Sequence, residues 1–551
     1  MKRITLLMVL MAFGIILSAQ ITPTCYRLSL SDKNNSPYSI NDPSAYLSER
    51  ALAKRARFSI PITEQDFPVN PQYLQAIKAI DTSIRVLCTS KWMNTATIYC
   101  PDSTKLPQVQ ALAFVTDILP VAAYNLSSPH GNAEPEGHIH SSIVANPAKD
   151  SVMFYDYGNG AAQIALHNGH LLHNVGYRGD GMLIAVFDAG WNGVNTSIFF
   201  RHIFESGRLV GTRDLLPWAD NVYAGHHHGT LVTSTMAAMT EGVFVGTAPE
   251  ASYYLIRSEE PNMEQLIEED FWAQAAEIAD SLGADVINSS LGYTEFADFP
   301  QGNYTYEAMD GVTSIASRAA TILGQKGVVV CISAGNEGAH EWHYIGHPSD
   351  AFDVLAVGAA DTAGNIAPFS SRGPSYDGRV KPDITSVGVN TACFWPGDYL
   401  GTADGTSLAG PVAAGLCACL WQALPNYSAV QLMQIIRESG SCYSNPNDSL
   451  GYGIPDFYAA YRMHQADAVT DYVPTRIEVF PNPCVDVVKI PNRMQDIQHI
   501  DIYSLDGKLI MQNDPSPDYF ITLDVSRLPK GMYLGKVRLA SGRTQTFKLV
   551  K

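Results

Sequence analysis

The sequence predicts an α/β protein with a doubly wound, mostly parallel β-sheet and a smaller domain at each end. Between residues 151 and 468, apolar runs alternate with helical segments. The region before them mixes short helices and strands, and residues 471–551 carry strand patterns only. Strands that alternate with helices form parallel sheets, because each crossover helix packs on a face of the sheet.

Composition supports a large core and excludes some partners. The chain has 551 residues, of which 46% are hydrophobic and 16% charged, and its net charge is −18. That length suggests several domains. No run of Lys and Arg stands out in this acidic chain, so we expect it to bind neither nucleic acid nor an anionic membrane surface.

The N-terminus has the pattern of a cleaved signal peptide over residues 1–19. Lys2 and Arg3 precede the apolar run Ile4–Leu17, and small residues permit cleavage after Ala19. A membrane anchor is the alternative, but this run is shorter than the roughly 20 residues of a spanning helix. No later stretch is long enough to span a bilayer. We therefore expect an exported mature chain with no transmembrane helix.

The nine cysteines leave the disulfide pairing open. Export permits disulfides, yet an odd number leaves at least one thiol unpaired within the chain. Cys417 and Cys419 lie two positions apart on an expected helix, so their side chains point in different directions. Cys331 falls in an expected core strand, as a small buried hydrophobe. The sequence has no CxxC metal pattern.

Residues 20–125 read as a small α+β domain, and residues 126–150 as a linker. The patterns predict helices over 43–55 and 69–80, and strands over 84–87 and 96–99. The linker is rich in Pro, Gly and His, which makes it an easy place for proteolytic cleavage.

The central region, residues 151–468, repeats strand and helix in turn. A buried strand over 182–187 ends at Asp188. Helices over 263–282 and 313–326 each stop at a glycine and are followed by strands over 284–288 and 328–332, and a further strand covers 353–357. Ligands bind at the carboxyl ends of such strands. Asp188 and the segment after Ile332 both lie there.

Three short motifs carry most of the chemical information. They are Asp188-Ala189-Gly190, His228-Gly229-Thr230 and Gly405-Thr406-Ser407-Leu408-Ala409-Gly410-Pro411. This order of Asp, His and Ser is that of subtilisin, and the motifs resemble those of the subtilisin-like serine proteases, or subtilases. Leu408 replaces the family's usual Met, and Ala189 replaces a usual Ser or Thr, which removes one hydroxyl near the carboxylate. The resemblance implies a subtilisin-like fold for the central region.

Each motif residue has a chemical role in such a protease. A serine hydroxyl needs a base to become nucleophilic, so Ser407 is the candidate nucleophile at the start of a helix, whose free N–H groups favour negative charge. His228 is the candidate base and then acid, and Asp188 orients it. A helix-capping Ser and a turn Asp are the ordinary alternatives. The run His226–His228 could instead bind metal, but successive helical residues diverge by about 100° and chelate poorly.

The resemblance also implies binding residues. Asn336, in Ser333-Ala334-Gly335-Asn336, matches the amide donor of the oxyanion hole; in subtilisin the loss of that donor costs about 10²–10³ in kcat. A turn Asn beside Gly is the alternative. Ser290, Leu291 and Gly292 match the substrate-binding edge, where an extended peptide adds a strand.

Family resemblance extends to both end domains. Residues 20–125 take the place of a subtilase propeptide, which assists folding and blocks the active site; an ordinary accessory domain is the alternative. The tail resembles the C-terminal sorting domain of the type IX secretion system. The matching features are the opening Phe480-Pro481-Asn482-Pro483, the hairpin with Asp506-Gly507 and the terminal Lys551. An immunoglobulin-like packing module is the alternative.

These patterns together predict a secreted or cell-surface serine endopeptidase made as a zymogen. It would hydrolyse polypeptides through an acyl-enzyme intermediate, and the type IX secretion machinery would recognise its C-terminal domain. The competing class is a non-catalytic binding or adhesion protein that keeps the fold. An esterase would need a Gly-x-Ser-x-Gly elbow, which Ser407 lacks. No cofactor is required; calcium is common in subtilases, but no Asp-rich loop here marks a dedicated calcium site.

Overall fold

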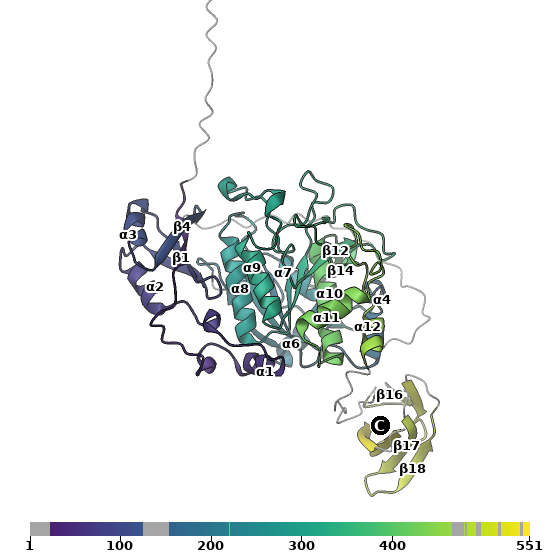
Figure 1. The fold of residues 1–551 in the computed structure, drawn as a ribbon. Helices are drawn as coiled ribbons and strands as arrows, with labels where there is room; N and C mark the ends of the chain where they lie inside the picture. Colours follow the sequence, from purple (N-terminus) through teal and green to yellow (C-terminus); the bar gives the residue numbers. More distant parts are fainter. Residues whose placement is uncertain are drawn as a thin grey trace, which may run out of the picture.

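A seven-stranded parallel sheet forms the centre of the molecule (Figure 1). The computed structural model describes residues 22–124, 154–219, 221–465, 479, 482–491, 497–515, 520–539 and 544–551. Strand order is β13-β12-β11-β10-β5-β9-β6, with every neighbouring pair parallel. The predicted α/β fold class is confirmed. The predicted signal peptide and linker lie outside the described residues.

The strands of this sheet are β5 (Leu183–Asp188), β6 (Leu209–Asp214), β9 (Ser252–Arg257), β10 (Val286–Ser289), β11 (Val329–Ser333), β12 (Leu355–Ala360) and β13 (Ile384–Val387). The helices of the same domain are α4 (Ala161–Ala165), α5 (Gly169–Asn174), α6 (Arg201–Glu205), α7 (His228–Ala237), α8 (Glu268–Leu282), α9 (Ile315–Gln325), α10 (Thr406–Ala423), α11 (Ala429–Glu438) and α12 (Phe457–His464). Two small hairpins pair β7 (Met239–Thr240) with β8 (Phe244–Val245), and β14 (Thr391–Trp395) with β15 (Tyr399–Ala403).

The two faces of the sheet bury separate cores, because successive strand residues point to opposite faces. From β5, Ile184 and Val186 join one cluster with residues of α7 and α10. Ala185 and Phe187 join the other, with residues of α8 and α9. All six residues of β5 are buried, as expected for a parallel strand covered by helices on both sides.

Two predicted helices start later than expected. The pattern over 263–282 becomes a helix only at Glu268, whose carboxylate accepts the backbone N–H groups of Glu260 and Gln265 and so fixes residues 260–267 as a loop. Helix α9 starts at Ile315, because the Ser314 hydroxyl caps the N–H groups of Ala316 and Ser317.

The N-terminal domain is a four-stranded antiparallel sheet with short helices. The sheet order is β2-β3-β1-β4. Its elements are β1 (Cys25–Leu30), α1 (Glu49–Arg57), α2 (Pro71–Lys78), β2 (Arg85–Ser90), β3 (Thr95–Tyr99), α3 (Leu106–Gln110) and β4 (Val115–Ala122). The predicted helix over 43–55 begins only at Glu49, because Ser48 caps it through the Ala51 N–H. The domain packs against α8, with α1 at the far end of that helix (Figure 1).

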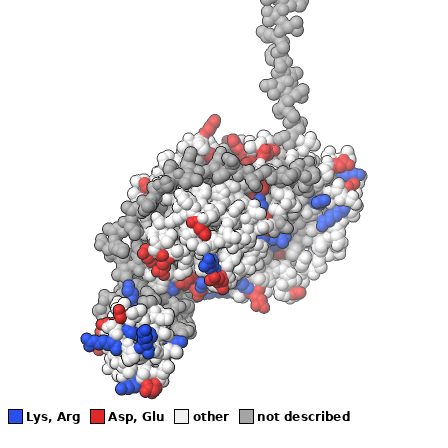
Figure 2. All heavy atoms as spheres, turned by 180° about the vertical axis from the view of Figure 1, so that it is seen from behind, with Lys and Arg blue, Asp and Glu red and all other residues white. Residues whose placement is uncertain are grey.

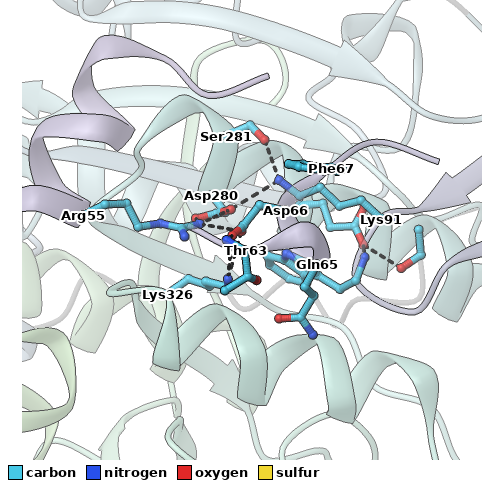
Figure 3. A network of polar contacts seen from close by, with 12 residues as sticks. Arg55, Thr63, Gln65, Asp66, Phe67, Lys91, Asp280, Ser281 and Lys326 are labelled. Carbon is cyan, nitrogen blue, oxygen red and sulfur yellow. Dashed lines mark hydrogen bonds and ion pairs between the residues drawn. The ribbon is translucent and has the colours of Figure 1, made fainter. Parts of the chain in front are cut away.

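Buried charges join this domain to the central α/β region. Arg27 of β1 makes a bidentate pair with Asp270 of α8, at 2.6 and 2.7 Å. Figure 3 shows a second network, in which Arg55 and Lys91 approach Asp280 from opposite sides. Its bonds are Arg55–Asp280 at 2.8 and 2.9 Å, Arg55–Asp66 at 3.1 Å, Lys91–Asp280 at 3.3 Å and Lys326–Asp66 at 2.9 Å.

The described short 3₁₀ turns complete the element list. They are Pro43–Ala45, Glu64–Asp66, Ser103–Lys105, Val222–Ala224, Pro300–Gly302 and Tyr306–Ala308.

The C-terminal unit consists of two small antiparallel sheets around its own core. One pairs β16 (Val487–Pro491) with β19 (Phe520–Asp524); the other has the order β18-β17-β20-β21. The latter strands are β17 (Ile497–Ser504), β18 (Leu509–Asn513), β20 (Met532–Leu539) and β21 (Thr544–Val550). Their apolar cluster contains only residues between Val479 and Leu549. Part of the predicted opening motif, Phe480-Pro481, lies outside the described residues.

All nine cysteines are free thiols, and only Cys442 is not fully buried. Cys331 lies within β11, in the core as predicted. No described helix is both long and apolar enough to cross a membrane. On the face drawn in Figure 2, acidic and basic side chains are interspersed over the surface.

Candidate functional site

Asp188 and His228 meet at the carboxyl end of β5, next to the middle strand of the sheet. Asp188 is the last residue of β5, and His228 is the first residue of α7. The His228 Nδ1 lies 2.9 and 3.1 Å from the two carboxylate oxygens of the fully buried Asp188. The Ala189 backbone N–H also donates to this carboxylate, at 2.8 Å. The carboxylate therefore fixes the imidazole ring with its other nitrogen, Nε2, turned away.

A glycine and a second histidine make this approach feasible. Gly190 has φ +144°, and a Cβ there would lie 2.6 Å from the His226 backbone nitrogen. His226 Nδ1 in turn accepts the backbone N–H of His228, at 3.2 Å. This bond satisfies one of the free N–H groups at the start of α7 and orients the first turn.

Ser407 occupies the second position of α10. The preceding Gly405, at φ +151°, turns the chain sharply into the helix. Leu408 and Leu231 share a small buried cluster with Cys393, which holds the first turns of α10 and α7 together. The Ser407 carbonyl accepts the Ser290 hydroxyl at 2.8 Å. Among the described hydrogen bonds, none joins the Ser407 hydroxyl to His228; such bonds often tighten only when substrate is present.

Asn336 is held by Thr406, the neighbour of Ser407. It lies just after β11, and its Oδ1 accepts both the backbone N–H and the hydroxyl of Thr406, each at 2.9 Å. The Thr406 hydroxyl also accepts the N–H of Gly335, at 3.2 Å. With its oxygen committed to Thr406, the Asn336 side chain turns its NH₂ group to the other side, where it can donate to a bound oxygen.

The three predicted edge residues follow β10 directly. Ser290 accepts a hydrogen bond from Asn288 and donates one to Ser407, which ties the edge to α10. Leu291 is buried and Gly292 is exposed. Tyr293 then exchanges backbone hydrogen bonds with His347, at 2.8 and 3.1 Å. Residues 290–292 thus lie beside the start of α10 with Gly292 open to solvent.

Electrostatics separate the three consecutive histidines. Burial disfavours a charged His228, but the Asp188 carboxylate outweighs burial and raises the pKa of His228. Burial and neighbouring histidines lower the pKa of His226, and that of His227 to about 4. Only His228 is therefore poised to gain a proton and hold it near neutral pH, as a general base must.

Within the described ranges, the histidine run forms no cluster of potential metal ligands. The one group of three such side chains there is acidic: Glu259, Glu264 and Glu268, whose carboxylate oxygens lie within 4.8 Å of one another. Carboxylate oxygens suit calcium. Whether the chain binds calcium stays a prediction.

Sequence reasoning missed three contributors. His226 accepts the His228 N–H, Thr406 orients Asn336, and residues 265–267 contact the end of the N-terminal domain. There Ile267 donates its N–H to the Val121 carbonyl at 3.1 Å, and Gln265 accepts the Ala123 N–H at 2.7 Å. The Gly-Thr-Ser motif already contained Thr406; nothing in the sequence marked the other two.

Comparison with known protein families finds three matches along the chain. The model of the subtilase family matches residues 179–453. A model of the peptidase S8 propeptide domain of Bacteroidota matches residues 25–136. The model of a secretion system C-terminal sorting domain matches residues 478–551.

Similar curated proteins are bacterial proteases. The chain is 31% identical to subtilisin BL of Lederbergia lenta over 291 residues, which covers 53% of this chain and 94% of that protein. It is 31% identical to M-protease of Shouchella clausii, covering 53% of this chain and 67% of that protein. It is 28% identical to the serine protease AprX of Bacillus subtilis, with 53% and 66% covered.

Proposed function

Because this chain belongs to the subtilase family of serine endopeptidases, we propose that it cuts peptide bonds with Asp188, His228 and Ser407. The observation that carries this assignment is the hydrogen bond from His228 Nδ1 to the buried Asp188, at 2.9 Å. It leaves Nε2 as the basic nitrogen, on the helix that packs beside the one bearing Ser407.

In the proposed reaction, His228 Nε2 takes the hydroxyl proton as the Ser407 Oγ attacks the carbonyl carbon. The negative charge on the carbonyl oxygen is met by the Asn336 NH₂ group and the N-terminus of α10. Protonated His228 then gives its proton to the leaving amine, which breaks the peptide bond and leaves an acyl-enzyme on Ser407. Water, deprotonated by His228, hydrolyses that ester and frees the enzyme. Residues 290–292 would pair with the backbone of the substrate.

The domain organisation is that of an exported zymogen. The chain carries a subtilase propeptide domain and a secretion sorting domain, and the protein is secreted or displayed at the cell surface. We propose residues 20–125 as the inhibitory propeptide, residues 126–150 as the segment cut on maturation, residues 151–468 as the peptidase, and residues 471–551 as the domain that the type IX machinery reads. Removal of residues 1–19 as a signal peptide belongs to the same proposal.

The decisive experiment is labelling of the processed protein with a fluorophosphonate probe, beside Ser407→Ala. An activated serine forms a covalent bond to this probe, so we expect labelling and peptide hydrolysis in the wild type and neither in the variant. Circular dichroism would show that the variant still folds. Hydrolysis that survives in Ser407→Ala would remove Ser407 as nucleophile. A folded, propeptide-free wild type that takes no label would favour a non-catalytic binding protein.

Activity should depend on pH through His228. The base form is needed, so kcat/KM should fall as the pH drops through the raised pKa of this histidine. Asp188→Asn removes the charge that raises the pKa of His228, so the acid limb of the pH–rate profile should move to lower pH. The rate at neutral pH should fall by about 10⁴. A pH–rate profile of both proteins measures this. A rate that stays constant from about pH 8 to pH 5 would exclude a histidine base.

A further inference from the structure

A group of three carboxylates outside the triad has no positive partner in the described structure. Glu268 is fully buried, Glu259 is 7% exposed, and Glu264 reaches the surface. Arg257, two residues before Glu259 in the chain, is committed to Glu260 at 2.8 Å and to Asp214 at 3.6 Å. Among the ion pairs of the described residues, none involves Glu259, Glu264 or Glu268. Burial and neighbouring carboxylates raise the pKa of Glu259, Glu264 and Glu268, because a buried charge without a partner is unfavourable. A cation that arrives from outside would stabilise their charged forms.

The cluster lies between the two segments that would flank a bound peptide. Glu259 accepts the Tyr293 hydroxyl at 3.1 Å, and Tyr293 directly follows the edge 290–292. Glu264 and Glu268 flank residues 265–267, against which the end of the propeptide lies as an extended chain. At its other end this loop reaches the triad, because Ser258 donates its N–H to the Asp188 carbonyl at 3.2 Å.

The propeptide itself places a poorly matched side chain at this position. Tyr124 is only 3% exposed and stacks edge-on against Trp218, at 4.8 Å. Its hydroxyl has no hydrogen-bond partner among the described residues. Burial raises the pKa of Tyr124, and Glu268, Cys25 and Glu259 add to this effect. The inhibitory segment therefore brings a neutral hydroxyl to a place where acidic side chains could accept hydrogen bonds from a positive group.

We propose that Glu259, Glu264 and Glu268 form a substrate subsite for a basic side chain, lysine or arginine, on the acyl side of the scissile bond. This inference rests on the proposed peptidase function and adds the class of substrate to it. The ammonium or guanidinium group would enter beside Glu264, the carboxylate nearest to solvent, and reach Glu259. Glu268, whose carboxyl oxygens accept two backbone N–H groups, completes the cluster.

This assignment explains why the propeptide can leave after cleavage. Val121, Ala122, Ala123 and Tyr124 offer the cluster no cation, so the inhibitory segment gains nothing from these carboxylates. A substrate that brings lysine or arginine gains a charge-assisted hydrogen bond. The segment 259–268 thus holds the propeptide through the propeptide backbone and would favour a basic substrate through its carboxylates.

The test compares matched peptides with the processed full-length enzyme. In each pair, lysine is replaced by glutamine at one position before the scissile bond, one position at a time. We expect kcat/KM to be about ten- to a hundredfold higher for lysine at one of these positions, the range for a hydrogen bond between charged groups. Glu259→Gln, which keeps the bond from Tyr293, and Glu264→Gln should each reduce this ratio. Glu295→Gln removes an exposed carboxylate from the following loop and should leave the ratio unchanged.

Each outcome distinguishes the subsite from the catalytic assignment. An enzyme that cuts both peptides of every pair at equal rates refutes the subsite and leaves the peptidase function intact. An enzyme that cuts nothing and takes no fluorophosphonate refutes the function itself; in that case, equal binding of fluorescent lysine and glutamine peptides would refute the subsite as well. The assay is repeated in EDTA and in added calcium. Lysine preference that calcium abolishes, with a calcium-induced rise in Tm that Glu259→Gln removes, would assign the cluster to a metal and overturn the proposal.

Discussion

The two end domains are joined to the peptidase in opposite ways. The propeptide domain shares a hydrophobic core with it: Trp92, Val121 and Tyr124 belong to the same cluster as residues of α8 and α9. Buried ion pairs surround this shared core. The apolar cluster of the tail includes Val488, Ile500 and Phe547 and contains no described residue of the peptidase.

From this difference we expect the propeptide domain, and not the tail, to take part in folding the enzyme. A domain that completes another's core stabilises it and cannot leave without exposing apolar and charged surface. A domain with its own core can be recognised by another protein, can change its position or can be removed while the enzyme stays folded. The propeptide domain has a cluster of its own as well, so it differs from the sorting domain by the additional core that it shares with the peptidase.

The largest loss of stability should come from removing one large aromatic side chain from each core. Trp92→Ala and Phe547→Ala should each cost about 3–5 kcal/mol, since both side chains are buried. Calorimetry of the full chain, carried out in the Ser407→Ala background to prevent self-digestion, should show the losses in different transitions. Trp92→Ala should lower the transition shared by propeptide and peptidase, and Phe547→Ala only that of the tail.

The comparison fails if Trp92→Ala leaves the peptidase transition unchanged or if Phe547→Ala lowers it. Either result would mean that the division of the cores does not govern unfolding. Proteins with several domains need not unfold in one step, so the transitions are assigned with an isolated tail fragment.

A smaller effect should follow from Glu277→Gln, on α8. The Glu277 carboxylate accepts the Ser90 hydroxyl at 2.6 Å and the N–H groups of Lys91 and Trp92 at 2.8 and 3.0 Å. Glutamine has one acceptor oxygen, so a buried N–H loses its partner at a cost of about 1–3 kcal/mol. Once the linker is cut, the propeptide should leave about ten times sooner, seen as a shorter lag before activity. Glu438→Gln, at an exposed position of α11, should not change the lag; a normal lag in Glu277→Gln would contradict the interface.

The smallest effect should come from mild acid. Burial alone would raise the pKa of Asp66, but Lys326, the Thr63 N–H and Arg55 together lower it below its ordinary 3.8. A carboxyl with a lowered pKa stabilises the interface above about pH 3.8 and loses this contribution only as the pH falls further. Burial raises the pKa of Glu277, so protonation of the Glu277 carboxylate does not weaken the binding of the propeptide to the peptidase. At pH 5 gel filtration should find the cut propeptide still bound; its release at that pH would contradict these assignments.

The fold class and several helix–strand pairs followed from the sequence, because apolar runs and glycine stops are local signals, whereas strands such as β6 and β9 were not predicted. Gly283 and Gly327 correctly ended their helices, with φ values of +78° and +87°. The start of α8 was wrong by five residues, since Met263 continues the apolar period into the loop. What delays the helix is the contact of Glu268 with Glu260 and Gln265, and period alone does not reveal a tertiary hydrogen bond.

The candidate site was predictable where chemistry imposes a motif. Asp188, His228 and Ser407 were proposed from three motifs, and the structure brings the first two into hydrogen-bond contact. The acidic cluster was not predictable, because Glu259, Glu264 and Glu268 look like ordinary charges before and within a helix. Their meaning depends on Tyr293 and Tyr124, which come from other parts of the chain.

The reactivity of the buried thiols should report whether the propeptide is still bound to the peptidase. Cys25 and Cys88 lie in the core that the propeptide shares with the peptidase, and burial raises the pKa of Cys25 to about 12. Alkylating reagents attack thiolates, so both should stay unmodified as long as the propeptide is docked. Once it departs, the pair becomes accessible on the released fragment, while Cys331 and Cys417 remain sealed inside the enzyme. The order in which these thiols become alkylated would show when the propeptide separates from the peptidase, and no substrate is needed for this measurement.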